Sequence, residues 1–330
     1  MFNNTRPIGL LSIGRLPTSP AGHSGWFVAV ALALLVCAPA RADVQLDVRE
    51  WAWSSGQNAA PVETATRTWV KGNARRVESQ LVSALNDSAA QASRFAQIDR
   101  LDRDSSYFVR PAEQVFVPVA HAGSRQQNRA RARAFAAAQA AGTAPRDTLA
   151  PVTITDLGRS RMIAGMACRG LVVDLHFAYR DSALGPESQL EGILSDTVWM
   201  APADAPVAAI GGFERALARH TAADSMLAAG NAVQLAEERG LGLVAVLQRT
   251  LRGLPGQVLG SHFVNLLRGL PRGLSGMERL PDGTAVVQRT VREAVAVRVD
   301  PLPDELFEPP PGFRRAERGV RAESTDEKAP

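Results

Sequence analysis

Apolar and polar residues alternate one by one along much of the chain between residues 44 and 119. Val44, Leu46 and Val48 are each separated by one polar residue, which is the period-two pattern of a strand with one buried face. Glycine, asparagine and aspartate interrupt the alternation at short intervals, as in Lys71-Gly72-Asn73, and these residues favour tight turns. The pattern predicts a meander of antiparallel hairpins, with strands at residues 44–48, 64–70, 75–82, 95–101, 107–110 and 115–117.

The same period returns in the second half of the chain. A strand predicted at residues 171–179 carries five large side chains on one face: Leu171, Val173, Leu175, Phe177 and Tyr179. Further strands are predicted at residues 152–156, 193–200 and 287–299, the last of them after a turn at residues 281–283. Residues 306–313 close the domain, and we expect residues 314–330 to form a flexible tail.

Residues 205–270 follow a helical period instead. Leu247, Leu251 and Leu254 recur at steps of three and four residues, and so do Leu259, Phe263 and Leu266/Leu267. Arg-Gly-Leu-Pro occurs at residues 252–255 and again at 268–271, and each copy is typical of a helix end. We therefore expect one long helical segment here.

Residues 121–147 differ from both patterns, because they are rich in alanine, arginine and glutamine and hold few large apolar side chains. This composition is typical of a solvated helical or disordered insertion. Contact of its arginines with an anionic surface is the alternative.

The first forty-two residues have the order of a secretory signal peptide. Arg6 and Arg15 precede an apolar run from Trp26 to Ala38, and small residues precede a predicted cleavage after Ala42. The run of about 13 residues is shorter than the roughly 20 that a membrane-spanning helix needs. Lipidation at Cys37 is the less favoured alternative, because Val36 is larger than the residue that a lipoprotein signal peptidase accepts there. We expect a periplasmic protein with no transmembrane segment after processing.

Processing also changes the charge. It removes three of the 37 basic residues and none of the 33 acidic ones, so the mature chain is nearly neutral and a nucleic-acid partner is not expected. Only Cys168 remains of the two cysteines, so the fold must be stable without an internal disulfide.

The sequence contains no arrangement typical of catalysis or metal binding. His121, His176, His220 and His262 are far apart, and we expect each to be a surface or edge histidine. Asp99, Asp102 and Asp104 span a predicted turn, where carboxylates commonly bond to the backbone. Cys168 lies among small apolar residues, which favours a buried, inert thiol. We therefore expect a non-enzymatic protein with no catalytic residues, no metal and no cofactor.

Several segments, in order, resemble the periplasmic lipoprotein-carrier (LolA/LolB-like) superfamily, and in particular a domain of unknown function within it. The Lys71-Gly72-Asn73 hairpin and the closing Leu306-Phe307-Glu308-Pro309 carry the resemblance most clearly. It covers residues 43–313, apart from the 121–147 insertion and the long 205–270 segment, through the matching pieces 69–78, 98–109, 161–168, 199–201 and 306–313.

The resemblance implies an α+β fold in which a strongly curved antiparallel sheet, a half-open barrel, has helices covering its concave face. Such a fold implies a groove for a hydrophobic ligand, either a lipid or the acyl chain of a lipoprotein. We expect this groove to be lined by Leu247, Leu251, Phe263, Leu267, Phe177 and Tyr179. Two alternatives stay open: the helical leucines could be permanent core, and the domain could be an envelope protein-interaction or sensor module without a bound lipid.

Overall fold

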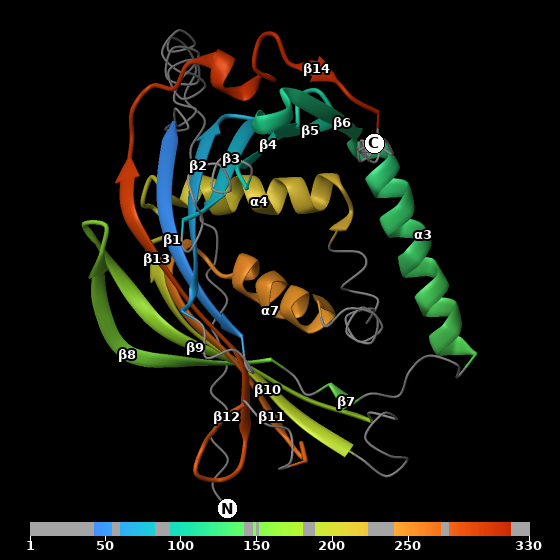
Figure 1. Ribbon diagram of the computed structural model, residues 1–330, viewed down its shortest axis with the longest axis vertical. Coiled ribbons are helices and arrows are strands. Elements are labelled where there is room, and N and C mark those ends of the chain that lie inside the picture. Colours follow the sequence, from blue (N-terminus) through green and yellow to red (C-terminus); the bar gives the residue numbers. More distant parts are fainter. Residues whose placement is uncertain are drawn as a thin grey trace, which may run out of the picture. The chain divides into compact units, whose positions relative to one another are not determined.

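The computed structural model describes residues 43–54, 60–82, 93–141, 148–149, 152–180, 189–223, 241–271 and 277–317. Fourteen strands within these ranges form one curved sheet, and its strand order is β14-β6-β5-β4-β3-β2-β1-β13-β11-β10-β9-β7, with β12 beside β13 and β8 beside β9 (Figure 1). Every strand pairing among the described residues is antiparallel except that of β14 with β6. The strands are β1 (Val44–Ser54), β2 (Val62–Lys71), β3 (Ala74–Leu81), β4 (Phe95–Arg100), β5 (Ser105–Arg110), β6 (Val115–Ala120), β7 (Thr148–Leu149), β8 (Thr153–Ile163), β9 (Met166–Arg180), β10 (Gln189–Ala201), β11 (Gln257–Arg268), β12 (Glu278–Arg279), β13 (Ala285–Arg298) and β14 (Arg314–Arg315).

The predicted hairpins are confirmed. β2 and β3 pair around a two-residue turn in which Gly72 has a φ of 54°, a conformation that glycine adopts without strain. β3, β4, β5 and β6 follow as neighbours in sequence order. The sheet along this half of the chain is therefore the meander that the alternation predicts.

β1 lies in the middle of the sheet, between β2 and β13. Its side chains Val44, Leu46 and Val48 are buried on one face, as the alternation predicts. The pairing of β1 with β13, which runs from Gln45 to Ser54 of β1, thus joins the two halves of the sheet.

The prediction that residues 205–270 are wholly helical is wrong. Two helices, α4 (Ala208–His220) and α7 (Leu241–Gly253), lie in the described part of this segment, but residues 257–268 form strand β11 between β10 and β13. Phe263 and Leu267 therefore lie on a strand. Leu259, Phe263 and Leu267 are four residues apart, a spacing that both a helix face and a strand face satisfy. Pairing with the backbones of β10 and β13 selects the strand over the helix.

The helices α4 and α7 pack against the sheet. Ile210 and Phe213 of α4 share a buried cluster with Leu46 of β1, and Leu247 of α7 shares another with Val173 of β9 and Val198 of β10. Two short 3-10 helices, η1 (Pro111–Glu113) and η3 (Asp304–Phe307), lie at the ends of strands, and Phe307 of η3 is buried. The main apolar core thus lies between the sheet and the helices α4 and α7.

The 121–147 segment contains the helix α3 (His121–Ala140), most of whose described side chains are exposed or partly exposed. The expected tail is wrong at its start, because Arg314 and Arg315 form β14 beside β6. The backbone N–H groups of Arg314 and Ala316 donate to the carbonyls of Gln114 and Phe116. The predicted signal peptide, residues 142–147 and residues 318–330 lie outside the described part. None of the described helices has both the length and the apolar character needed to cross a membrane.

Candidate functional site

A cavity of about 530 Å³ lies between α4, α7 and the strands β10, β11 and β13. This volume falls within the range of about 300–1,000 Å³ that is usual for small-molecule sites. Because α4 and α7 form one wall and the sheet forms the other (Figure 1), the cavity is bounded by elements far apart in the sequence.

The apolar part of the lining includes three of the residues expected to form a groove. Leu247 and Leu251 come from α7 and Phe263 from β11, and Met200 of β10 lies beside them in the same cluster. Leu247 is only 2% exposed and is therefore mainly core, whereas Leu251 and Phe263 are partly exposed. The apolar wall therefore has a fixed base and a more accessible rim.

Of the other three expected residues, Phe177 and Leu267 are not among the described residues that line this cavity. Phe177 of β9 lies near Phe263 in a neighbouring cluster, and its ring covers Gly192 on β10, where a Cβ would come within 2.0 Å of the ring. Leu267 pairs with Gly192 further along β11. Tyr179 lies near the end of β9, opposite Leu190. The structure thus divides the six residues into a cavity wall and a more distant part of the sheet.

Charged and uncharged polar side chains form much of the rest of the lining. Arg75 donates to the buried carboxylate of Asp99 at 2.7 Å and approaches Glu214 of α4 at 3.7 Å. Arg215 of α4 donates to the backbone carbonyl of Arg252 at 3.3 Å, which ties α4 to the end of α7. The cavity is consequently amphipathic, with a more polar lining than the apolar groove that the sequence predicts.

Asp196 is the most unusual residue of the lining. Its side chain is only 6% exposed, and its Oδ1 has no hydrogen-bond partner among the described residues. Burial raises its pKa to about 6, and the opposing effects of the Ser261 hydrogen bond and the positive charge of Arg292 are smaller. A carboxylate that is buried and half-bonded can accept a hydrogen bond from a ligand in the cavity.

Asp196 was not among the residues expected to form the site, although the alternation contains the signal. It shares the parity of Leu194, Val198 and Met200, which are buried along β10. An acidic residue at an inward position of a strand departs from the rule that buried charges are rare. Such a departure is a reason to examine the position as a candidate site residue.

Two glycines allow close packing where the turn into β11 contacts the end of β10 and the helix α4. A Cβ on Gly256, whose φ is 104°, would lie 2.1 Å from the carbonyl oxygen of Ala201. A Cβ on Gly211 would lie 2.8 Å from Oε1 of Gln257 and 3.0 Å from the carbonyl oxygen of Gly256. This close packing holds one end of the cavity in place.

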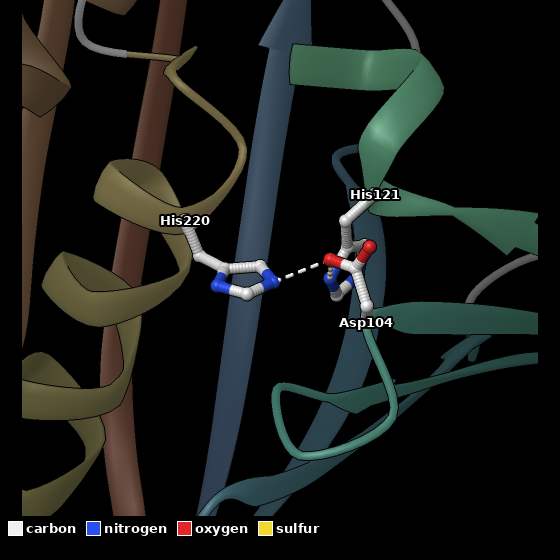
Figure 2. A group of neighbouring side chains, drawn as sticks. All are labelled: Asp104, His121 and His220. Atoms are coloured by element: carbon white, nitrogen blue, oxygen red, sulfur yellow. Dashed lines mark hydrogen bonds and ion pairs between the residues drawn. The ribbon is translucent and has the colours of Figure 1, made fainter.

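The expectation that each histidine lies at the surface or at an edge is wrong for His121, and sequence reasoning missed its contact with the partly exposed His220. His121 is buried, and its ring lies 5.2 Å from the ring of His220, with Asp104 beside both (Figure 2). His176 and His262 are exposed, as expected. Sequence spacing could not show the pairing, because the fold brings α3 and the end of α4 together.

The expectation for the three aspartates is also incomplete. Asp99 lies on β4 rather than in the turn, and it is fully buried against Arg75. Asp102 accepts from the side chain of Arg100 at 2.7 Å. These carboxylates therefore bond to arginine side chains, because the strands place the guanidinium groups directly beside them.

Cys168 is buried, as predicted, and it forms no disulfide. Burial raises the pKa of its thiol, so little of the reactive thiolate forms at neutral pH. This environment supports a structural role.

No family model matches this chain, and no curated protein matches it. Among solved structures, the crystal structure of a LolA superfamily protein from Nitrosomonas europaea aligns with 81% of this chain and 90% of that chain, at 10% sequence identity and a TM-score of 0.24. A TM-score this low does not establish a common fold.

Proposed function

We propose that this protein is a non-enzymatic binding or carrier protein that holds a lipid or an acylated protein by its acyl chain in the cavity beneath α4 and α7. The observation that carries the proposal is the amphipathic lining. Leu251 and Phe263 offer a partly exposed apolar wall, and the unpartnered carboxylate oxygen of Asp196 offers an acceptor nearby. A ligand with an acyl chain and a hydroxyl or amine group matches both features.

In this proposal α4 and α7 cover the concave face of the sheet and move enough to admit the chain. Leu247 stays in the core at the base of α7, while the rim residues Leu251 and Phe263 contact the ligand. Entry of the acyl chain requires α4 and α7 to open locally, and the free energy of this opening must be lower than that of global unfolding.

We further propose that the protein is exported to the periplasm and begins at Asp43. Asp43 accepts a hydrogen bond from the backbone N–H of Leu302 at 2.9 Å, and β1 starts at the next residue. Cleavage after Ala42 would therefore leave the whole described sheet intact. Mass analysis of the N-terminus of protein from the periplasmic fraction tests this step, and a chain beginning at Met1 would contradict it.

The test of the ligand is mass spectrometry of lipids retained through purification without detergent, followed by titration with a fluorescent fatty-acid probe. We expect a retained lipid and saturable probe binding. Phe263→Ala should weaken the probe by at least about tenfold, which corresponds to about 1.4 kcal/mol. Val264→Ala is the matched control, because its side chain points to the opposite face of β11.

The proposal fails if the purified protein carries no lipid and the probe does not bind. A stable protein partner in a crosslinked pull-down from the envelope, together with no lipid, would instead support an interaction or sensor module. Equal probe affinities in Phe263→Ala and Val264→Ala would place any lipid outside this cavity.

A further inference from the structure

Three side chains with metal-ligating atoms meet at one end of the sheet (Figure 2). Asp104 ends the turn between β4 and β5, His121 is the first residue of α3, and His220 is the last residue of α4. One ligating atom from each lies within 4.8 Å of the others. Nε2 of His220 lies 2.6 Å from Oδ1 of Asp104, and Nδ1 of His121 lies 3.9 Å from the same oxygen.

The hydrogen bonds around His121 determine which of its ring nitrogens carries the proton. The hydroxyl of Ser106 donates to Oδ1 of Asp99 at 2.6 Å, so its oxygen accepts from Nε2–H of His121 at 2.8 Å. Nδ1 of His121 is then unprotonated, and it lies 3.9 Å from Oδ1 of Asp104.

The lone pair of this nitrogen has no hydrogen-bond donor among the described residues. His121 is 2% exposed, and its Nδ1 is a buried atom without a partner. A buried imidazole nitrogen beside a carboxylate oxygen is unfavourable unless a cation or a proton lies between them. The arrangement of Asp99, Ser106 and His121 is also the kind of outer support that metal-binding histidines use to fix their orientation.

We propose that Asp104, His121 and His220 form a binding site for a divalent transition-metal ion, and Zn²⁺ suits these ligands best. Two imidazole nitrogens and one carboxylate oxygen are ligands that Zn²⁺ prefers, whereas Mg²⁺ and Ca²⁺ prefer oxygen alone. The three protein ligands leave a fourth position for water. His220 binds through Nε2 and His121 through Nδ1.

Arg125 of α3 competes with the ion for the same place. Its Nη1 and Nη2 lie 2.5 and 2.9 Å from the two carboxylate oxygens of Asp104, and Nη1 lies 3.2 Å from Nε2 of His220. The guanidinium thus holds the carboxylate when no ion is bound. Because its side chain is 28% exposed, Arg125 can turn toward solvent when the ion enters.

A bound ion would connect three elements that come from distant parts of the sequence. It would join the β4–β5 turn, the start of α3 and the end of α4, next to Ala218 and Thr221 in the cavity lining. The site is separate from the lipid proposal, because none of its three ligands lines the cavity.

The test is calorimetric titration of purified, EDTA-treated protein with ZnCl₂, alongside thermal unfolding with and without the ion. We expect one ion per chain, a higher Tm with Zn²⁺, and no response to MgCl₂. His220→Gln should weaken binding by at least about tenfold, and Ser106→Ala should weaken it by about 10–100-fold. Arg125→Gln should strengthen it, because the competing charge is removed.

His262→Gln is the matched control, since this histidine is exposed on β11 and should leave the affinity unchanged. The absence of saturable binding to the parent protein would overturn the proposal. Zn²⁺ binding that His220→Gln, Ser106→Ala and Arg125→Gln all leave unaltered would overturn it as well. Circular dichroism of each variant checks that it is folded, and if His220→Gln is not, Ser106→Ala and Arg125→Gln decide.

Discussion

Replacing Asp196 with asparagine should make the protein more stable at neutral and alkaline pH. The substitution keeps the size of the side chain and a carbonyl oxygen that can accept from Ser261, but it removes the charge. Asp196 is 6% exposed and has an unpartnered oxygen, so its ionised form is poorly solvated in the native state. Asparagine avoids this cost.

The size of the effect follows from the pKa. Burial raises the pKa of Asp196 from 3.8 to about 6, and each pKa unit corresponds to about 1.4 kcal/mol. The native state therefore holds the proton more tightly than the unfolded state, and this residue lowers stability as pH rises from about 4 to 6. Above pH 7 the full cost of about 3 kcal/mol is present, whereas at pH 3.5 almost none of it is.

The assay is urea unfolding of the parent protein and Asp196→Asn at pH 3.5 and pH 8. We expect the variant to be more stable by about 2–3 kcal/mol at pH 8 and by less than about 0.5 kcal/mol at pH 3.5, with unchanged m-values. Asp174→Asn on β9 is the control, because this carboxylate is partly exposed and a substitution there should change stability by less than about 0.5 kcal/mol at either pH. A variant that is less stable than the parent at pH 8, or a stability difference independent of pH, would refute the reasoning.

Three further substitutions test the packing through thermal or denaturant unfolding. Cys168→Ser should cost about 1–3 kcal/mol, because the buried hydroxyl would face partners spaced for a larger sulfur atom, among them the carbonyl of Met166 at 3.5 Å and the backbone of Ile163. The native thiol should also react slowly with Ellman's reagent, and fast reaction would mean that it is accessible. Gly256→Ala should cost at least about 2 kcal/mol, because its Cβ would collide with the carbonyl of Ala201 at a positive φ, and an unchanged Tm would show that the turn adapts. Leu247→Ala should cost about 2–5 kcal/mol, and a loss below about 1 kcal/mol would show that α7 contributes little to the core.

The alternation of apolar and polar residues was sufficient to predict the hairpins. Val44, Leu46 and Val48 are buried on one face because strand geometry places every second side chain on the same side. β11 was not predictable in this way, because steps of four residues fit both a helix and a strand. Its conformation depends on β10 and β13, and local sequence does not contain those partners.

The candidate site was only partly predictable for a related reason. Leu247, Leu251 and Phe263 were expected from their apolar character, and the structure places them on one wall of the cavity. The meeting of His121 with His220 depends on the path of the chain between them, and residue spacing carries no information about that path. The family resemblance likewise implied an apolar groove, whereas the charged part of the lining comes from residues on separate strands and helices.

The place of β1 in the sheet has a consequence for when the chain can fold. β1 is made first, but one of its two partners, β13, is made near the end of the chain. Until β13 is available, β1 and β11 each present an unpaired edge, and such edges tend to associate with other chains. Contacts of this sequence separation also form slowly. The hairpins from β2 to β6 can form early, but the two halves of the sheet can be joined only after residues 285–298 have been synthesised.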